Sequence, residues 1–224
     1  MYATLLFFIG MILGSFLTCM AERLSAGQSI FNTSRSHCPV CQHPLRVWQL
    51  MPLIGISCQR GRCFDCHTPI SWRSTFIELT TGSLLLITLT DITSLKLVLY
   101  FGYLVLIFNS LTDYLTFNVY PLTLVPPALL GWWVHPLTFT GDTWLVVGLL
   151  VALYAVAILT TKFGLGDVDV LVMLTLLASP AVVLSSLTLA ACGALLILCL
   201  QRSRTHLPFV PFMTWAFILT TQLT

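Results

Sequence analysis

Two aspartates lie at the ends of apolar runs, where a membrane helix would meet water. Asp113 ends one run, and Asp167 follows Gly164 and Gly166 directly before another. An acid in or near hydrocarbon is costly, so an acid kept at such a position is a candidate functional residue. Two neighbouring carboxylates can hold one proton between them; the ionised acid then activates a water while the protonated acid polarises a carbonyl. The pair therefore indicates hydrolysis of the aspartyl-protease type.

Each acid also has a plain structural explanation. Asp167 fits a helix N-cap, which the helix dipole favours, and Asp113 fits an interfacial acid without chemistry. The two glycines before Asp167 would let the backbone approach a substrate strand closely and adopt unusual turns. Asp169 follows two residues later, so on a helix it points to a different face. Glu78, near the start of the second apolar run, would either serve the candidate active site or pair with an arginine.

Four cysteines form two C-x-x-C pairs with 21 residues between them: Cys38 with Cys41, and Cys63 with Cys66. Each pair can close a tight knuckle, and two knuckles give a tetrahedral four-thiolate site of the kind that suits zinc. Reducible or unliganded thiols are the alternative. Cys58 is expected to be free. The flanking histidines are expected to be solvated loop residues rather than ligands: His37, His43 and His67.

The composition predicts an all-α polytopic membrane protein. The chain is 57% hydrophobic and 8% charged with a mean hydropathy of +0.94, whereas a soluble domain carries roughly a quarter charged residues. At about 20 residues a span, about eight transmembrane helices and one polar insert fit, and membrane lipid rather than nucleic acid is the expected surrounding. The expected spans are Tyr2–Met20, Thr75–Thr90, Leu95–Thr112, Val119–Val134, Thr143–Thr161, Val168–Ala178, Ala181–Leu200 and Phe209–Leu223.

Three parts follow from this pattern. Residues 1–20 form a first span, expected to be retained because no basic n-region precedes it and no Ala-x-Ala site follows it. Residues 21–74 form the four-cysteine insert, which has little core of its own and would depend on its metal. Residues 75–224 form a core of about seven spans that carries both acids.

The basic residues predict the orientation. The insert 21–74 holds six arginines, and with alternating spans only Lys96 falls on the opposite side. Because Lys and Arg concentrate on the cytoplasmic side, the insert and both acids are expected on that side of the membrane, with both termini outside. The other basic residues on the cytoplasmic side would be Lys162, Arg202 and Arg204.

Taken in order, these residues resemble the prepilin leader peptidases, the type IV prepilin peptidase family of membrane aspartyl proteases with a Gly-x-Gly-Asp motif. The compact form is similar to the competence-type branch of Gram-positive bacteria. Besides the acids, the resemblance is carried by segments 14–17, 23–24, 36–41, 43–45, 61–66, 69–71, 78–82 and 207–212.

The resemblance implies Asp113 and Asp167 as the catalytic pair and the four cysteines as structural zinc ligands. It implies a prepilin or pseudopilin substrate, cleaved after a glycine between a short basic leader and an apolar helix. Many relatives also methylate the new N-terminus with S-adenosylmethionine. Two departures stand out: Asp169 replaces the family's usual lysine, and Val119 precedes a proline, Pro121, that comes one position late.

Three other functions remain open. A presenilin-like intramembrane protease shares Gly-x-Gly-Asp but is not expected to carry the cysteine insert. An ion- or proton-coupled transporter would use the two acids as ligands, yet it should show repeat symmetry or interrupted spans, and neither is evident. A thiol oxidoreductase would use C-x-x-C, which the expected cytoplasmic side disfavours.

Overall fold

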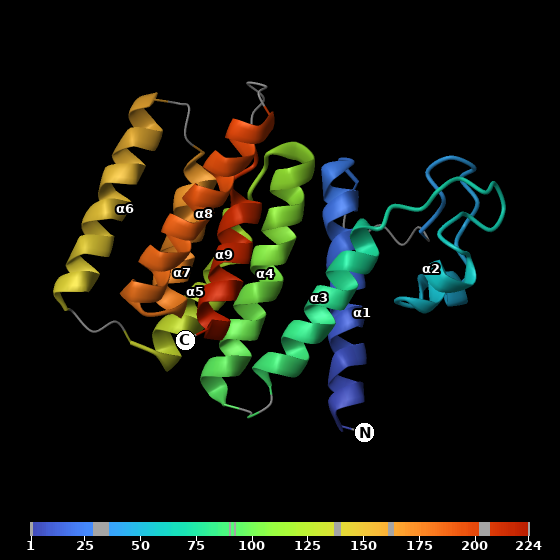
Figure 1. The fold of residues 1–224 in the computed structure, drawn as a ribbon, viewed down its shortest axis with the longest axis horizontal. Helices are drawn as coiled ribbons and strands as arrows, with labels where there is room; N and C mark the ends of the chain where they lie inside the picture. Colours follow the sequence, from blue (N-terminus) through green and yellow to red (C-terminus); the bar gives the residue numbers. More distant parts are fainter. Residues whose placement is uncertain are drawn as a thin grey trace. The chain divides into compact units, whose positions relative to one another are not determined.

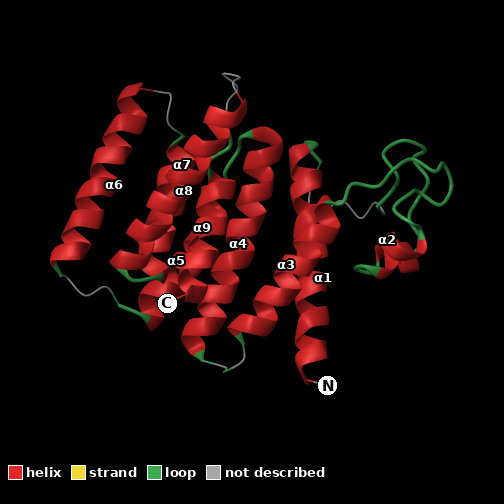
Figure 2. Ribbon diagram, viewed as in Figure 1, coloured by secondary structure: helices red, strands yellow, loops and turns green. Residues whose placement is uncertain are grey.

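The computed structural model of the chain describes residues 2–28, 36–89, 91, 93–136, 140–160, 164–201 and 207–223. Within these residues the structure is helical, and extended pairing is limited to two isolated β-bridges (Figure 2). The predicted all-α class is therefore confirmed. The contacts divide the chain into two compact units, residues 1–90 and 91–224, which are described separately.

The first unit consists of two long helices and the insert that connects them. Helix α1 (Tyr2–Ser25) leads into the insert, which holds a 3₁₀ turn (Val47–Leu50) and the short helix α2 (Ile54–Cys58) (Figure 1). Helix α3 (Arg73–Thr88) then packs along α1.

Glycines allow α1 and α3 to pack backbone against backbone. A Cβ added at Gly10 would lie 2.6 Å from the carbonyl oxygen of Thr81, and one added at Gly14 would overlap the Thr81 hydroxyl. A Cβ at Gly82 would lie 2.9 Å from the carbonyl oxygen of Phe7. Small residues at such contacts are typical of helix pairs in lipid, where van der Waals packing drives association.

In its described residues, the second unit is a bundle of six helices, whose arrangement Figure 1 shows. Helix α4 packs against α5 and α9, α5 packs against α7, and α8 packs against α9. Tyr103 on α4 lies at the core, edge-on to Phe217 of α9, and its hydroxyl is 2.7 Å from the Thr221 hydroxyl. The six helices are α4 (Ser94–Thr116), α5 (Pro121–Val134), α6 (Gly141–Thr160), α7 (Leu165–Leu177), α8 (Pro180–Gln201) and α9 (Val210–Leu223).

Local sequence signals explain where several helices begin and end. The Thr93 hydroxyl accepts a hydrogen bond from the N–H of Lys96 and so caps the start of α4. Phe117 ends α4 in a left-handed conformation (φ 55°). Pro121 begins α5, where its missing N–H costs nothing.

Each of the eight apolar runs predicted as a span corresponds to a helix. Four described helices, α1, α4, α6 and α8, are long and apolar enough to cross a membrane, and α5 and α9 are shorter apolar helices. These helices support an integral membrane protein, while the number of crossings stays a prediction. Of the residues used to predict orientation, several lie outside the described part of the chain: Arg35, Lys162, Arg202 and Arg204.

Candidate active site and metal centre

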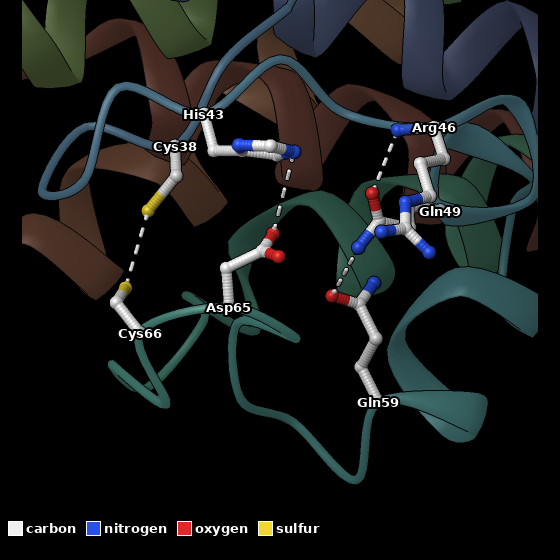
Figure 3. Close-up of polar contacts among 7 residues, drawn as sticks. All are labelled: Cys38, His43, Arg46, Gln49, Gln59, Asp65 and Cys66. Carbon is white, nitrogen blue, oxygen red and sulfur yellow. Dashed lines mark hydrogen bonds and ion pairs between the residues drawn. The ribbon is translucent and has the colours of Figure 1, made fainter.

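The four predicted ligands in the insert come together. The sulfur atoms of Cys38, Cys41, Cys63 and Cys66 all lie within 4.8 Å of one another. The sulfurs of Cys38 and Cys66 face each other at 3.7 Å (Figure 3). A tetrahedron with metal–sulfur bonds of about 2.3 Å has edges of roughly 3.8 Å. The cluster therefore fits a four-thiolate metal site.

The two C-x-x-C pairs adopt the same backbone turn, although their intervening residues differ. The N–H of Gln42 donates to the carbonyl of Cys38 at 2.9 Å, and the N–H of His67 donates to that of Cys63 at 3.0 Å. Gln42 and His67 are both left-handed, at φ 57° and 61°. Each turn is closed by a β-bridge, His37 with Pro44 and Arg62 with Pro69. The insert thus presents two thiol pairs on matching turns.

The surroundings of the thiols shift the pKa values of Cys66 and Cys41 in opposite directions. The Thr68 hydroxyl, 3.1 Å from the Cys66 sulfur, and the Thr68 N–H lower the pKa of Cys66 to about 6. The N–H of His43 acts to lower the pKa of Cys41, but desolvation and the neighbouring thiols outweigh it and raise that pKa to about 12. The thiolate is the ligand form, so a cation among the sulfurs is what would allow all four to ionise.

The neighbouring polar residues brace the insert rather than join the cluster. His43 faces Asp65, with Nε2 4.0 Å from a carboxylate oxygen (Figure 3). Gln49 accepts a hydrogen bond from the Arg46 N–H at 2.7 Å and donates to Gln59 at 3.2 Å. In the described part of the chain the metal-binding group contains cysteines alone, and Cys58 lies outside it, exposed.

Asp113 is a buried carboxylate on the last turn of α4. Its side chain is shielded from solvent, and its Oδ2 accepts a hydrogen bond from the N–H of Val210 at 3.1 Å. Val210 begins α9, so the carboxylate lies at a helix N-terminus, where free N–H groups and the helix dipole favour an anion. A contact across 97 positions of sequence thus fixes Asp113.

Asp167 lies in the first turn of α7, with its N–H donating to the Gly164 carbonyl at 3.1 Å. Helices α4 and α7 are in contact, and the carboxylates of Asp113 and Asp167 are close enough to interact electrostatically. The structure therefore places the two predicted acids within electrostatic range, while their role as a catalytic pair stays a prediction. Asp169, one of the two departures from the family pattern, is half-buried on α7 two residues after Asp167.

Each of the two glycines before Asp167 makes a different close contact that leaves little room for a side chain. A Cβ added at Gly166 would lie 2.6 Å from the Cβ of Val119, in the short link between α4 and α5. A Cβ added at Gly164 would lie 3.1 Å from the Asp167 carboxylate. In the structure, Gly166 therefore lies close to the α4–α5 link and Gly164 close to the Asp167 carboxylate. Contact of these glycines with a substrate stays a prediction.

Asn109 is a residue that the sequence reasoning missed. It is fully buried on α4, one turn before Asp113, and its Oδ1 accepts from the N–H of Tyr120 at 2.9 Å. Its Nδ2 donates to the Thr123 hydroxyl at 2.8 Å and to the Val105 carbonyl at 3.0 Å. Asn109 thus anchors the link that Gly166 contacts. The sequence signal that could have identified Asn109 is its polar amide side chain inside an apolar run.

Comparison with known proteins finds a family model that covers most of the first unit. A family model described as the Bacterial Peptidase A24 N-terminal domain matches residues 8–92, which include the four cysteines and end before both acids. The chain is similar to prepilin leader peptidases/N-methyltransferases of Myxococcus xanthus (40% identical over 84 residues, 38% of this chain) and Bacillus subtilis (36% over 81 residues, 36% of this chain). The similar protein of Aeromonas hydrophila is 32% identical over 107 residues, 38% of this chain.

These matches are partial. The aligned part spans 25%, 32% and 37% of the lengths of the Myxococcus, Bacillus and Aeromonas proteins. No solved structure matches the chain. The resemblance to prepilin leader peptidases drawn from the sequence is confirmed by the match of residues 8–92 to the Bacterial Peptidase A24 N-terminal domain model and by these relatives.

Proposed function

We propose that the chain is a membrane aspartyl endopeptidase that removes the short basic leader of a prepilin or pseudopilin. Cleavage would follow a glycine on the cytoplasmic side of the plasma membrane. The observation that carries the proposal is that helices α4 and α7 are in contact and place Asp113 and Asp167 within electrostatic range of each other. The peptidase A24 domain at residues 8–92 supports this function over a transporter or a presenilin-like protease.

The chemistry would follow from two carboxylates that share one proton. The ionised carboxylate takes a proton from a water, whose oxygen attacks the carbonyl carbon of the scissile peptide, and the protonated carboxylate donates a hydrogen bond to the carbonyl oxygen. Collapse of the tetrahedral intermediate breaks the C–N bond while the leaving amine gains a proton. The proton belongs to the pair, so no fixed role is assigned to either acid.

The four cysteines would hold a structural zinc ion. The spacing of their sulfurs and the exclusively thiol donor set suit zinc, and bound zinc would supply cross-linking of the insert. A thiol oxidoreductase is less well supported, because the two pairs converge on one point instead of presenting one exposed pair.

Methyl transfer to the new N-terminus is a second candidate activity. It is favoured because the matched domain contains the insert and because the similar proteins are named N-methyltransferases as well as peptidases. S-adenosylmethionine would be the methyl donor.

A cleavage assay tests the peptidase. Membranes containing the wild type, Asp113→Asn or Asp167→Asn are incubated with a prepilin-type peptide, and the products are identified by mass spectrometry. We expect the wild type to cut after the glycine and both variants to be inactive. Asp142→Asn is the matched control, because Asp142 is an exposed acid at the start of α6. Near-normal cleavage by either dyad variant would refute the mechanism.

A further inference from the structure

The cysteine insert has an exposed apolar edge. It consists of four side chains that are 46–77% exposed: Val47, Leu50, Met51 and Ile54. Val47 and Leu50 are three residues apart in the 3₁₀ turn, so their side chains share one of its faces. Met51 follows at the bend into α2, where its carbonyl accepts a hydrogen bond from the Gly55 N–H at 2.9 Å. Exposed apolar surface of this kind marks contact with lipid or with another protein.

The amide side chains of the same segment are turned into the insert. Gln49 is buried, accepts a hydrogen bond from the Arg46 N–H at 2.7 Å and donates one to the Gln59 side chain at 3.2 Å (Figure 3). Gln59 in turn donates to the Gly55 carbonyl at 2.9 Å. Residues 46–59 are therefore amphipathic, because their amides bond to one another and to the backbone while the apolar edge is left outside.

Two contacts show that the insert folds back along α1 and α3 instead of extending away from their ends. The Leu53 N–H, in the bend of the apolar edge, donates to the Glu78 carboxylate at 3.2 Å, and the Ser36 hydroxyl lies 3.8 Å from the Cys19 sulfur. Glu78 lies five residues after the start of α3, and Cys19 lies six residues before the end of α1. At 1.5 Å per residue, both contacts are about 8–9 Å along the helices from their ends. The bend is therefore level with the second turn of α3.

Residues at these helix ends mark the level of the membrane surface. Arg23 lies in the last turn of α1, Arg73 begins α3, and Trp72, which is 69% exposed, directly precedes it. Tryptophan and arginine collect at the interface between the hydrocarbon and water. The headgroup layer on each side of a bilayer is roughly 5–8 Å thick, so a contact about 8–9 Å along the helices from their ends reaches the boundary of the hydrocarbon.

Basic residues flank the apolar edge. Arg46 precedes it, with its guanidinium 5.2 Å from the centre of the Phe64 ring, and Arg60 and Arg62 follow α2. The sequence of residues 21–74 holds six arginines and two acids. Four thiolates around one zinc ion would add two negative charges, and the insert would still be basic. Long arginine side chains keep their charge at phosphate level while neighbouring apolar groups enter lipid, so the charge suits an anionic bilayer.

We propose that the apolar edge of the insert is embedded in the adjacent lipid leaflet, with its flanking arginines at the level of the anionic headgroups. The partner is the boundary between headgroups and acyl chains, which amphipathic segments enter by about 5–10 Å. Both ends of the insert continue into α1 and α3, so the bilayer is held within reach and lipid contact is intramolecular in effect. The insert is thus a membrane-surface element, not a loop surrounded by water.

Fluorescence quenching tests the depth of the edge. A fluorescent amino acid replaces Val47 in the zinc-loaded full chain, in nanodiscs of phosphatidylcholine and phosphatidylglycerol. One quencher is a lipid with a nitroxide high on its acyl chain, and the other is iodide in the water. Two exposed positions serve as references: Phe76 on α3 for lipid, and Gln28 beyond the end of α1 for water. We expect position 47 to resemble position 76, with lipid quenching at least about threefold stronger than at position 28.

A pair of variants locates the effect. Ile54→Glu puts a charge into the apolar edge and should lower lipid quenching at position 47 by at least about twofold, because a carboxylate is costly in lipid. Gln42→Glu adds the same charge at an exposed position of the insert outside the edge and should leave the quenching unchanged. Zinc content is measured for each variant. If Ile54→Glu loses zinc, the readings at position 47 without a second substitution decide the matter.

Three results would overturn the proposal. Iodide quenching at position 47 equal to that at position 28 would place the edge in water. Protection from both quenchers would show that protein covers the edge, either a second copy or another part of the chain. Unchanged lipid quenching in a zinc-containing Ile54→Glu variant would show that the edge does not hold the insert in lipid. The measurement uses no prepilin, so its outcome is independent of the proposed peptidase.

Discussion

A single methyl group at Gly166 should disable the proposed active site. The Cβ of alanine would lie 2.6 Å from the Cβ of Val119, whereas carbon atoms pack at about 3.5–4.0 Å. The two segments must therefore separate by about 1 Å, and the segment that moves carries Asp167 as the next residue. A displacement of about 1 Å in a catalytic group can cost about 100-fold in rate, so we expect Gly166→Ala to lose about two orders of magnitude in kcat/KM.

A compensating substitution makes the reasoning specific. Val119→Gly removes the atom that the new methyl group would strike, so the double variant Gly166→Ala with Val119→Gly should recover at least about tenfold over Gly166→Ala alone. Gly148→Ala on α6 is the matched control, because no atom lies within 4 Å of its added Cβ. The assay is cleavage kinetics on a prepilin-type peptide, with melting temperature in detergent measured alongside. Gly166→Ala within threefold of the wild type, or a double variant with no recovery, would refute this account.

Three further predictions concern other contacts. Asn109→Ala leaves the Tyr120 N–H without its partner and should lower the free energy of unfolding by about 1–3 kcal/mol, measured by denaturation in detergent; unchanged stability would contradict the anchoring role. Cys63→Ser should reduce bound zinc, measured by elemental analysis, to well below that of a Cys58→Ser control, and equal zinc contents would rule out the four-thiolate site. Gly14→Leu should prevent close packing of α1 on α3 and lower the yield of folded protein after extraction, whereas normal yield and melting would show that the helices do not need this contact.

The sequence alone determined the features that depend on local patterns. Hydropathy is a property of consecutive residues and can be read without the fold. Each of the eight predicted apolar segments corresponds to a helix in the structure. The C-x-x-C spacing is likewise local, because two residues between cysteines are enough to close a knuckle, and the four thiols do converge. The same short motifs carried the family resemblance that the comparisons confirm for residues 8–92.

Local patterns also leave the role of an individual polar side chain open. From the sequence, Glu78 could serve the site or pair with an arginine; in the structure it accepts hydrogen bonds from the Ser74 hydroxyl and the Leu53 N–H. Asn109 passed unnoticed inside an apolar run, because its partners follow α4, and only the folded link brings them back to it.

Only the tertiary structure decided that the two acids lie within electrostatic range of each other. A run of apolar residues predicts a helix but not its rotation about its own axis, which depends on the side chains packed against it. Helices α4 and α7 are in contact, Asp113 and Asp167 interact electrostatically, and the N-terminus of α9 supplies the N–H that binds Asp113. The sequence thus named the two candidate acids, and helix packing placed them within electrostatic range of each other.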